Sequence, residues 1–157
     1  MFKKILVLSL FLLAGCSGQN PAIEIRPIES KPIEKEFKDF QEKLLELHNK
    51  ERNSKGYSKL EINKNLCDYA QKHAEFMASK NSLVHSSMSN LMKVNSDSSL
   101  VGENIAWGQE TEESVVSSWM WSPMHKWNIL GSKYKKVGFG MKEGKDSRKY
   151  WCVVFSN

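Results

Sequence analysis

Histidine side chains are the first candidates for chemistry in this sequence. The chain has four of them, His48, His73, His85 and His125. A neutral imidazole binds divalent transition metals and also exchanges a proton near neutral pH, so histidines point to metal binding or acid-base catalysis. The sequence contains neither G-x-S-x-G nor H-E-x-x-H, the motifs that would make either chemistry specific. Both activities therefore have to be judged from the elements that position these residues.

The size and composition of the chain predict one compact domain with accessory segments. It has 157 residues, of which 40% are hydrophobic and 26% are charged. Its net charge is +5, and the basic residues alternate with acids, as in Lys50-Glu51-Arg52, instead of gathering in one block. This pattern is typical of a solvated surface, and we expect no nucleic-acid partner.

The N-terminus predicts a signal peptide over residues 1–15. Lys3 and Lys4 precede the apolar run Ile5 to Leu13, which is too short to span a bilayer. The run ends in Leu13-Ala14-Gly15-Cys16, which resembles the bacterial lipoprotein box. This resemblance implies cleavage before Cys16 and lipidation of its thiol. An ordinary secretory signal with an incidental cysteine is the alternative.

A lipidated Cys16 would anchor the protein to a membrane outside the cytoplasm. In a Gram-negative cell, Ser17 after the cysteine favours the outer membrane. In a Gram-positive cell, the anchor would lie in the outer face of the plasma membrane. Residues 16–35 are then predicted to form the lipidated cysteine and a proline-rich tether, because prolines disfavour a helix and favour extended chain.

The folded domain is predicted over residues 36–157 and begins with two helices. Apolar residues at helical spacing predict the first helix over residues 37–48 and the second after Asn63 or Asn65. His48 and His73 fall on the apolar faces of these helices, where a hydrogen-bonded core histidine is the expected role. Residues 82–109 are rich in Ser, Asn and Gly and show no helical period, so a long irregular connection is predicted.

The remaining residues predict more helix and then a hairpin. Thr111 followed by two glutamates predicts a helix N-cap, and Pro123 after Ser122 predicts a short restart of helix. Residues 136–141 and 150–156 are rich in β-formers and predict a C-terminal antiparallel hairpin. Helices followed by a hairpin indicate an α+β fold.

Four segments in chain order resemble the CAP superfamily, which includes cysteine-rich secretory proteins, venom allergens and plant pathogenesis-related proteins. They are Leu47-His48-Asn49-x-x-Arg52, Ala70-Gln71-x-His73-Ala74, His85-Ser86 ahead of Gly102-Glu103-Asn104-Ile105, and Trp119 through Ser122-Pro123-x-His125-x-x-Asn128-Ile129-Leu130. The resemblance implies a CAP-like α-β-α sandwich, with an antiparallel sheet between helical layers. It also implies a cleft lined by two histidines and two acids. The histidines correspond to His85 and His125 and one acid to Glu103, whereas the second acid falls near Ser122 here.

This implied cleft has three interpretations. The two histidines could hydrogen-bond to Glu103 and to backbone, with Asn104 fixing the neighbouring loop. They could instead hold zinc or another divalent metal, with water completing the shell. The third interpretation is hydrolysis, with Glu103 as general base on a metal-bound water, or with a nucleophilic serine beside a histidine. The candidate serines are Ser86, Ser87 and Ser122.

Two classes of function follow from these interpretations. The first is a surface- or periplasm-facing binding module for a lipid or other apolar ligand, a peptide or a partner protein, with a divalent metal between the histidines as an option. The second is a metal-assisted envelope hydrolase or peptidase. We favour the binding module over an enzyme, because the second acid and a nucleophile motif are both missing from the sequence.

Two further cysteines leave an open question. Cys67 lies in the second predicted helix and Cys152 in the last predicted strand. In an oxidising compartment they could form a disulfide between helix and sheet, or they could pack as two buried thiols.

Overall fold

The computed structural model describes residues 31–95 and 97–157, with side chains described from Lys38 onward. The predicted signal peptide, Cys16 and the tether up to residue 30 lie outside the described residues. The elements in chain order are α1 (Lys31–Asn53), β1 (Glu61–Ile62), α2 (Lys64–Lys80), α3 (Met88–Val94), β2 (Val101–Trp107), α4 (Glu112–Trp121), α5 (Pro123–Leu130), β3 (Lys136–Glu143) and β4 (Lys149–Ser156).

Local sequence signals explain where three of these helices begin. The Asn63 side chain accepts a hydrogen bond from the Leu66 amide and caps α2. Thr111 and Ser114 form a reciprocal capping box at the start of α4. Pro123 occupies the first turn of α5, where its missing amide proton costs nothing. These predicted starts are confirmed.

The sheet has four strands in the order β1-β3-β4-β2. The predicted C-terminal hairpin is confirmed, because β3 and β4 pair antiparallel from Lys136↔Ser156 to Glu143↔Lys149. β2 also pairs antiparallel with β4. The two-residue β1, however, pairs parallel with β3. The sheet is therefore mixed, whereas a wholly antiparallel sheet was predicted. β1 belongs to the segment between α1 and α2, which runs along the outer edge of β3 in the same direction as that strand.

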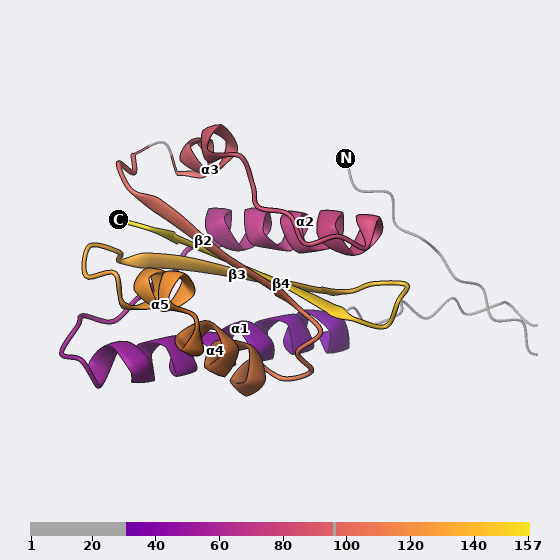
Figure 1. The fold of residues 1–157 in the computed structure, drawn as a ribbon, viewed down its shortest axis with the longest axis horizontal. Helices are drawn as coiled ribbons and strands as arrows, with labels where there is room; N and C mark the ends of the chain where they lie inside the picture. The colour runs from indigo at the N-terminus through magenta and orange to yellow at the C-terminus, as the bar shows by residue number, and fades with distance from the viewer. Residues whose placement is uncertain (1–30, 96) are drawn as a thin grey trace, which may run out of the picture.

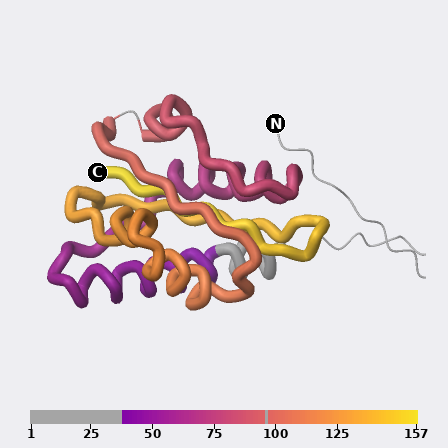
Figure 2. The backbone as a smooth tube through the Cα atoms, in the orientation of Figure 1, coloured from indigo at the N-terminus to yellow at the C-terminus, as the bar shows by residue number. Residues whose placement is uncertain are grey.

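Helices cover both faces of this sheet, which confirms the α-β-α sandwich (Figure 1). α2 and α3 lie on one face, and α1, α4 and α5 lie on the other. The hairpin of β3 and β4 runs between the two layers (Figure 2). Each face has its own buried cluster, one built around Trp119, Phe139 and Trp151, the other around Leu66, Met77 and Tyr150. Among the described residues, both clusters consist of residues between 40 and 155.

Two glycines set the distance between α2 and the sheet. A Cβ at Gly138 would lie 2.1 Å from the carbonyl carbon of Leu66, and a Cβ at Gly140 would lie 2.3 Å from that of Ala70. Both obstacles are helix backbone, which cannot move aside. The α2 backbone therefore packs directly on β3, which fixes the helix that carries His73.

His48 confirms its predicted role in the core. It is fully buried, and its Nδ1 donates to the Leu44 carbonyl at 2.7 Å. Burial away from water lowers the pKa of this imidazole to about 4. The neutral ring packs against Phe139, with 5.1 Å between the ring centroids.

Two predictions about the course of the chain are wrong. α1 begins at Lys31, whereas residues 16–35 were expected to be extended tether and the domain to begin at residue 36. Pro32 is compatible with this because a proline is tolerated in the first turn of a helix. Residues 82–109 are also not one irregular connection, since they contain α3, capped by Ser87, and β2. Among the described residues, no helix is both long enough and apolar enough to span a bilayer.

Candidate functional site

The strand β2 forms the edge of the sheet and carries the two central polar residues of the site. Glu103 and Asn104 are consecutive, so their side chains leave opposite faces of the strand. Glu103 shares its face with Val101 and Ile105, which belong to the α2-side cluster, while Ala106, on the face of Asn104, belongs to the other. Because β2 is an edge strand, groups from both helical layers can approach each other around it.

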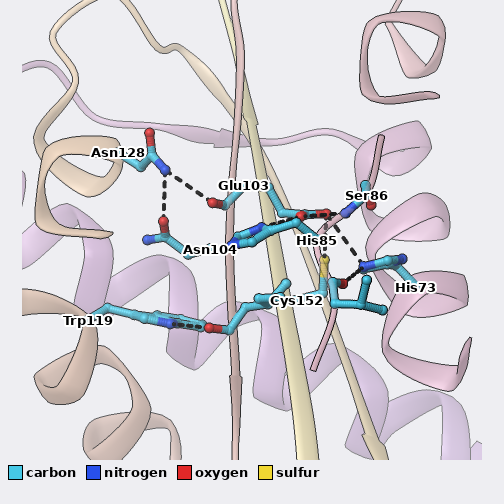
Figure 3. A network of polar contacts seen from close by, with 10 residues as sticks. His73, His85, Ser86, Glu103, Asn104, Trp119, Asn128 and Cys152 are labelled. Atoms are coloured by element: carbon cyan, nitrogen blue, oxygen red, sulfur yellow. Dashed lines mark hydrogen bonds and ion pairs between the residues drawn. The ribbon is translucent and has the colours of Figure 1, made fainter. Parts of the chain in front are cut away.

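The Glu103 carboxylate is buried and bonded inside the protein, with only 3% of its side chain exposed. Its Oε1 accepts hydrogen bonds from His85 Nδ1 at 2.8 Å and from the Ser86 amide at 3.0 Å. Its Oε2 faces the Cys152 thiol at 3.8 Å and His73 Nε2 at 3.8 Å (Figure 3). A buried carboxylate needs such partners. Glu103 therefore holds the segment after α2 against the edge strand.

His85 is held by this carboxylate but remains open to solvent. Its side chain is 59% exposed, although its Nδ1 points at Glu103. When Nδ1–H donates to the carboxylate, the neutral ring keeps its lone pair on Nε2, on the opposite side of the imidazole. Glu103 thus fixes both the tautomer and the orientation of His85, and His85 Nε2 is free to contact a ligand.

His125 reaches the same site from α5 on the other helical layer. The Asn104 side chain donates to the His125 carbonyl at 3.0 Å. Asn128, one turn further along α5, donates to Asn104 Oδ1 at 2.9 Å and to the Glu103 carbonyl at 3.1 Å. Burial lowers the pKa of His125, and the nearby charge of His85 lowers it further. His125 therefore lies within electrostatic reach of His85, and its lowered pKa favours the neutral imidazole at neutral pH.

The structure brings together four of the five predicted cleft residues. We call His85, Glu103, Asn104 and His125 the β2-edge site. Ser122, the fifth, ends α4 and precedes α5, and its hydroxyl makes no capping hydrogen bond. Residues 114–142 contain no aspartate or glutamate. Neither α5 nor residues 136–142 of β3 can therefore supply a second carboxylate to the site.

Three contributors to the site were not predicted from the sequence. His73 is hydrogen-bonded as expected, because its Nε2 donates to the Val84 carbonyl at 2.8 Å, but its position beside Glu103 was not predicted. Cys152 lies under the Glu103 carboxylate. Asn128 connects β2 to α5. The spacing of Asn104 and Asn128 within the family-like segments was the available signal, but the contact of Cys152 depends on a strand register that the sequence does not show.

The two cysteines are free and buried, so the structure contains the thiol pair and not the disulfide. Their sulfurs have different surroundings. The Cys67 thiol interacts with the Phe139 backbone, and the Cys152 thiol faces Glu103. Burial raises the pKa of both thiols, and for Cys152 the negative charge of Glu103 raises it further. Both side chains thus behave as small apolar core groups.

The donor set limits what metal the β2-edge site can hold. Within residues 31–95 and 97–157, no three or more His, Cys, Asp or Glu residues form a group able to hold a metal ion. His85 and His125 would be two imidazole ligands, and water would have to supply the others. The contact between Glu103 and His85 Nδ1 fits this use, because metal-bound histidines commonly donate their other ring proton to a carboxylate.

Sequence comparison identifies a family and a curated relative for most of the folded region. Residues 45–155 match the family described as CAP, the cysteine-rich secretory protein family. The protein YkwD of Bacillus subtilis, which is itself named as uncharacterized, is 36% identical over 122 residues. The match covers 74% of this chain and 46% of that protein, so the chain spans about half the length of this curated relative.

Solved structures share the fold at lower identity. An outer surface protein from Borrelia burgdorferi has a TM-score of 0.65 at 22% identity, covering 83% of this chain and 96% of that chain. An extracellular protein with an SCP domain from Bacillus anthracis has a TM-score of 0.68 at 21% identity, with coverages of 84% and 45%. NaASP2, crystallised with Zn²⁺, has a TM-score of 0.58 at 14% identity, with coverages of 74% and 78%. The sequence match over residues 45–155 and the shared fold establish that this chain belongs to the CAP family of cysteine-rich secretory proteins.

Proposed function

We propose that the chain is an extracytoplasmic binding module whose β2-edge site contacts the ligand through His85 and His125. The ligand is a lipid or other apolar molecule, a peptide or a partner protein. Structural neighbours named as an extracellular protein and as an outer surface protein support the location. The predicted lipidation of Cys16 would keep the module at a membrane surface, and it belongs to the same proposal.

One observation carries the choice of binding over hydrolysis: the Glu103 carboxylate is buried and already accepts two hydrogen bonds inside the protein. A general base must reach the proton that it removes, directly or through one water. Glu103 Oε1 already accepts from His85 Nδ1 and from the Ser86 amide, and only 3% of the side chain is exposed. This carboxylate is placed to orient His85, and the exposed imidazole is placed to meet a ligand.

A divalent metal such as Zn²⁺ is part of the proposal because the two imidazoles suit it. His85 offers Nε2 in a fixed tautomer, and His125 has a lowered pKa that keeps its ring unprotonated at neutral pH. A bound ion would supply a positive charge that attracts an oxygen or nitrogen atom of the ligand. With two protein ligands, the site would bind the ion more weakly than a three-histidine site does.

Zinc is also the probe that tests the proposal. The unlipidated chain 17–157, made without a histidine tag, is titrated with zinc by calorimetry at about pH 7.5 and about pH 5.5. We expect one ion per chain at the higher pH and a large loss of affinity at the lower pH, because protons compete for the imidazole lone pairs. His85→Ala and His125→Ala should each nearly abolish binding.

A matched control removes an imidazole that is not part of the pair. His73→Gln should leave zinc affinity unchanged, because His73 Nε2 is already bonded to the Val84 carbonyl. Equal loss in His73→Gln and His85→Ala would contradict the assigned pair. An unmodified chain that takes up no zinc at the higher pH would contradict the metal part of the proposal.

A further inference from the structure

Three large apolar side chains at the junction of α4 and α5 are mostly exposed to solvent. The exposed fractions are 86% for Trp121, 70% for Met124 and 74% for Trp127. Single exposed apolar residues are ordinary, but a group of them on a monomer surface marks an interaction site. None of the three contributes to the hydrophobic clusters on either face of the sheet.

These side chains lie close together in the chain, at the end of α4 and on α5. Met124 and Trp127 are three residues apart on α5, so they are neighbours on the same helix face. Trp121 lines a surface hollow together with Lys126. Trp127 lines a second hollow, of about 460 Å³, together with Lys133. We call Trp121, Met124, Trp127, Lys126 and Lys133 the α5 patch.

The chain segment that carries these residues is basic. Between residues 114 and 142 there are five lysines and no aspartate or glutamate. The hollow shared by Trp127 and Lys133 has no acidic residue in its lining. The hollow of Trp121 and Lys126 also contains Glu51 and Glu113, but Glu113 is paired with Lys43 at 3.1 Å. The α5 patch therefore combines exposed tryptophans with cations.

We propose that the α5 patch docks on the surface of an anionic lipid bilayer. Tryptophan prefers the boundary between water and lipid, and lysines beside it are attracted to anionic headgroups. Protein interfaces favour tryptophan as well, but they are depleted in lysine, so this combination fits a membrane better than a protein partner. Docking would bring α5, and with it His125, next to the bilayer.

The length of chain between the predicted anchor and the folded domain is compatible with such docking. Only residues 17–30 separate the predicted anchor at Cys16 from the start of α1 at Lys31, a span of at most about 50 Å. The patch proposal does not depend on the anchor, however, nor on the ligand of the β2-edge site. It is therefore tested on chain 17–157, which carries no lipid and contains both hydrophobic cores.

The test is co-sedimentation of this chain with vesicles. Vesicles of phosphatidylcholine alone are compared with vesicles that contain about 30% phosphatidylglycerol, at about 20 mM and about 500 mM salt. We expect binding to the anionic vesicles at low salt and its loss at high salt. Lys126→Glu changes the patch by two charges and should weaken partitioning roughly 25-fold, at about fivefold per charge. The double variant Trp121→Ser/Trp127→Ser should weaken it at least about tenfold.

Matched controls alter the opposite helical layer. Phe76→Ser removes an exposed aromatic residue from α2, and Lys72→Glu reverses an exposed charge on the same helix. Both should bind vesicles as the unmodified chain does. Equal loss in these controls, or no binding of the unmodified chain to anionic vesicles at low salt, overturns the proposal. If the chain instead forms a dimer that Trp121→Ser/Trp127→Ser dissociates, without binding vesicles, the patch is a contact between two copies and the membrane proposal is wrong.

Discussion

His85 Nδ1 and Glu103 Oε1 lie 2.8 Å apart, although one residue follows α2 and the other lies in the edge strand β2. This contact joins the connection after α2 to the sheet and determines the direction of the exposed imidazole. Glu103 is almost completely buried, whereas His85 is more than half exposed. The buried partner therefore positions the exposed one.

The coupling between these two residues can be measured by a double-mutant cycle. His85→Ala, Glu103→Gln and the double variant are unfolded with urea at neutral pH. We expect a coupling free energy of about 1 kcal/mol, because His85→Ala removes this hydrogen bond and Glu103→Gln removes the charge that strengthens it. A control cycle of Glu103→Gln with Lys64→Ala should give a coupling near zero, since Lys64 pairs with Asp68 and not with the site. Independent effects of His85→Ala and Glu103→Gln would contradict the positioning role.

The close packing of α2 on β3 predicts that Gly138 tolerates no larger residue. Gly138→Ala should lower the free energy of unfolding by about 3 kcal/mol, because its Cβ would meet helix backbone at 2.1 Å. Gly108→Ala is the control. It has nothing within 4 Å of the new Cβ, and its positive φ of 84° should cost only about 1 kcal/mol. Equal costs for the two variants would show that α2 can move away from the sheet.

The buried His48 predicts a loss of stability in acid. Its pKa is lowered to about 4 in the folded protein, so between about pH 6.5 and about pH 4 only the unfolded chain takes up this proton. The free energy of unfolding should fall by about 1.4 kcal/mol per pH unit across that window. His125, whose pKa burial also lowers, acts in the same direction. His48→Leu should therefore show a shallower fall than the unmodified chain, and parallel curves would contradict this assignment.

Much of the fold could be predicted because its signals are local. Asn63, Thr111 and Pro123 indicate helix starts within a few residues, and the hairpin of β3 and β4 has β-formers on both sides of a turn. β2 carries no comparable signal, because both of its faces are covered and its residues do not alternate between apolar and polar. α3 is only 7 residues long in a serine-rich stretch, so its capping by Ser87 was not distinctive.

The site was predictable only in part for a related reason. His85, Glu103 and His125 could be identified through the family resemblance, and the structure shows how Glu103 and His85 meet. The contact of Glu103 with Cys152 requires the register between β2 and β4, which sequence spacing does not give. His73 fits the helical pattern of a core residue, but that pattern does not reveal that Glu103 of β2 lies beside it.

The proposed anchor makes a prediction about cell fractions. Cys16→Ala should release the protein from membranes that are washed with about 500 mM salt into the soluble extracytoplasmic fraction, because the lipid is then missing. The salt wash removes any adsorption through the α5 patch, which is electrostatic in part. Ser17→Ala, next to the proposed lipidation site, should stay in the membrane fraction. Retention of Cys16→Ala after the wash would show that another segment holds the protein.

The central claim is that His85 and His125 act as one ligand-binding pair with His85 oriented by Glu103. Imidazole nitrogen NMR spectra of the tag-free chain 17–157 test it most directly, recorded at about pH 7.5 before and after zinc is added. We predict that His85 carries its proton on Nδ1, and that zinc shifts the resonances of His85 and His125 together while His48 and His73 stay in place. Unchanged resonances of His85 and His125, or a His85 proton on Nε2, would contradict the account.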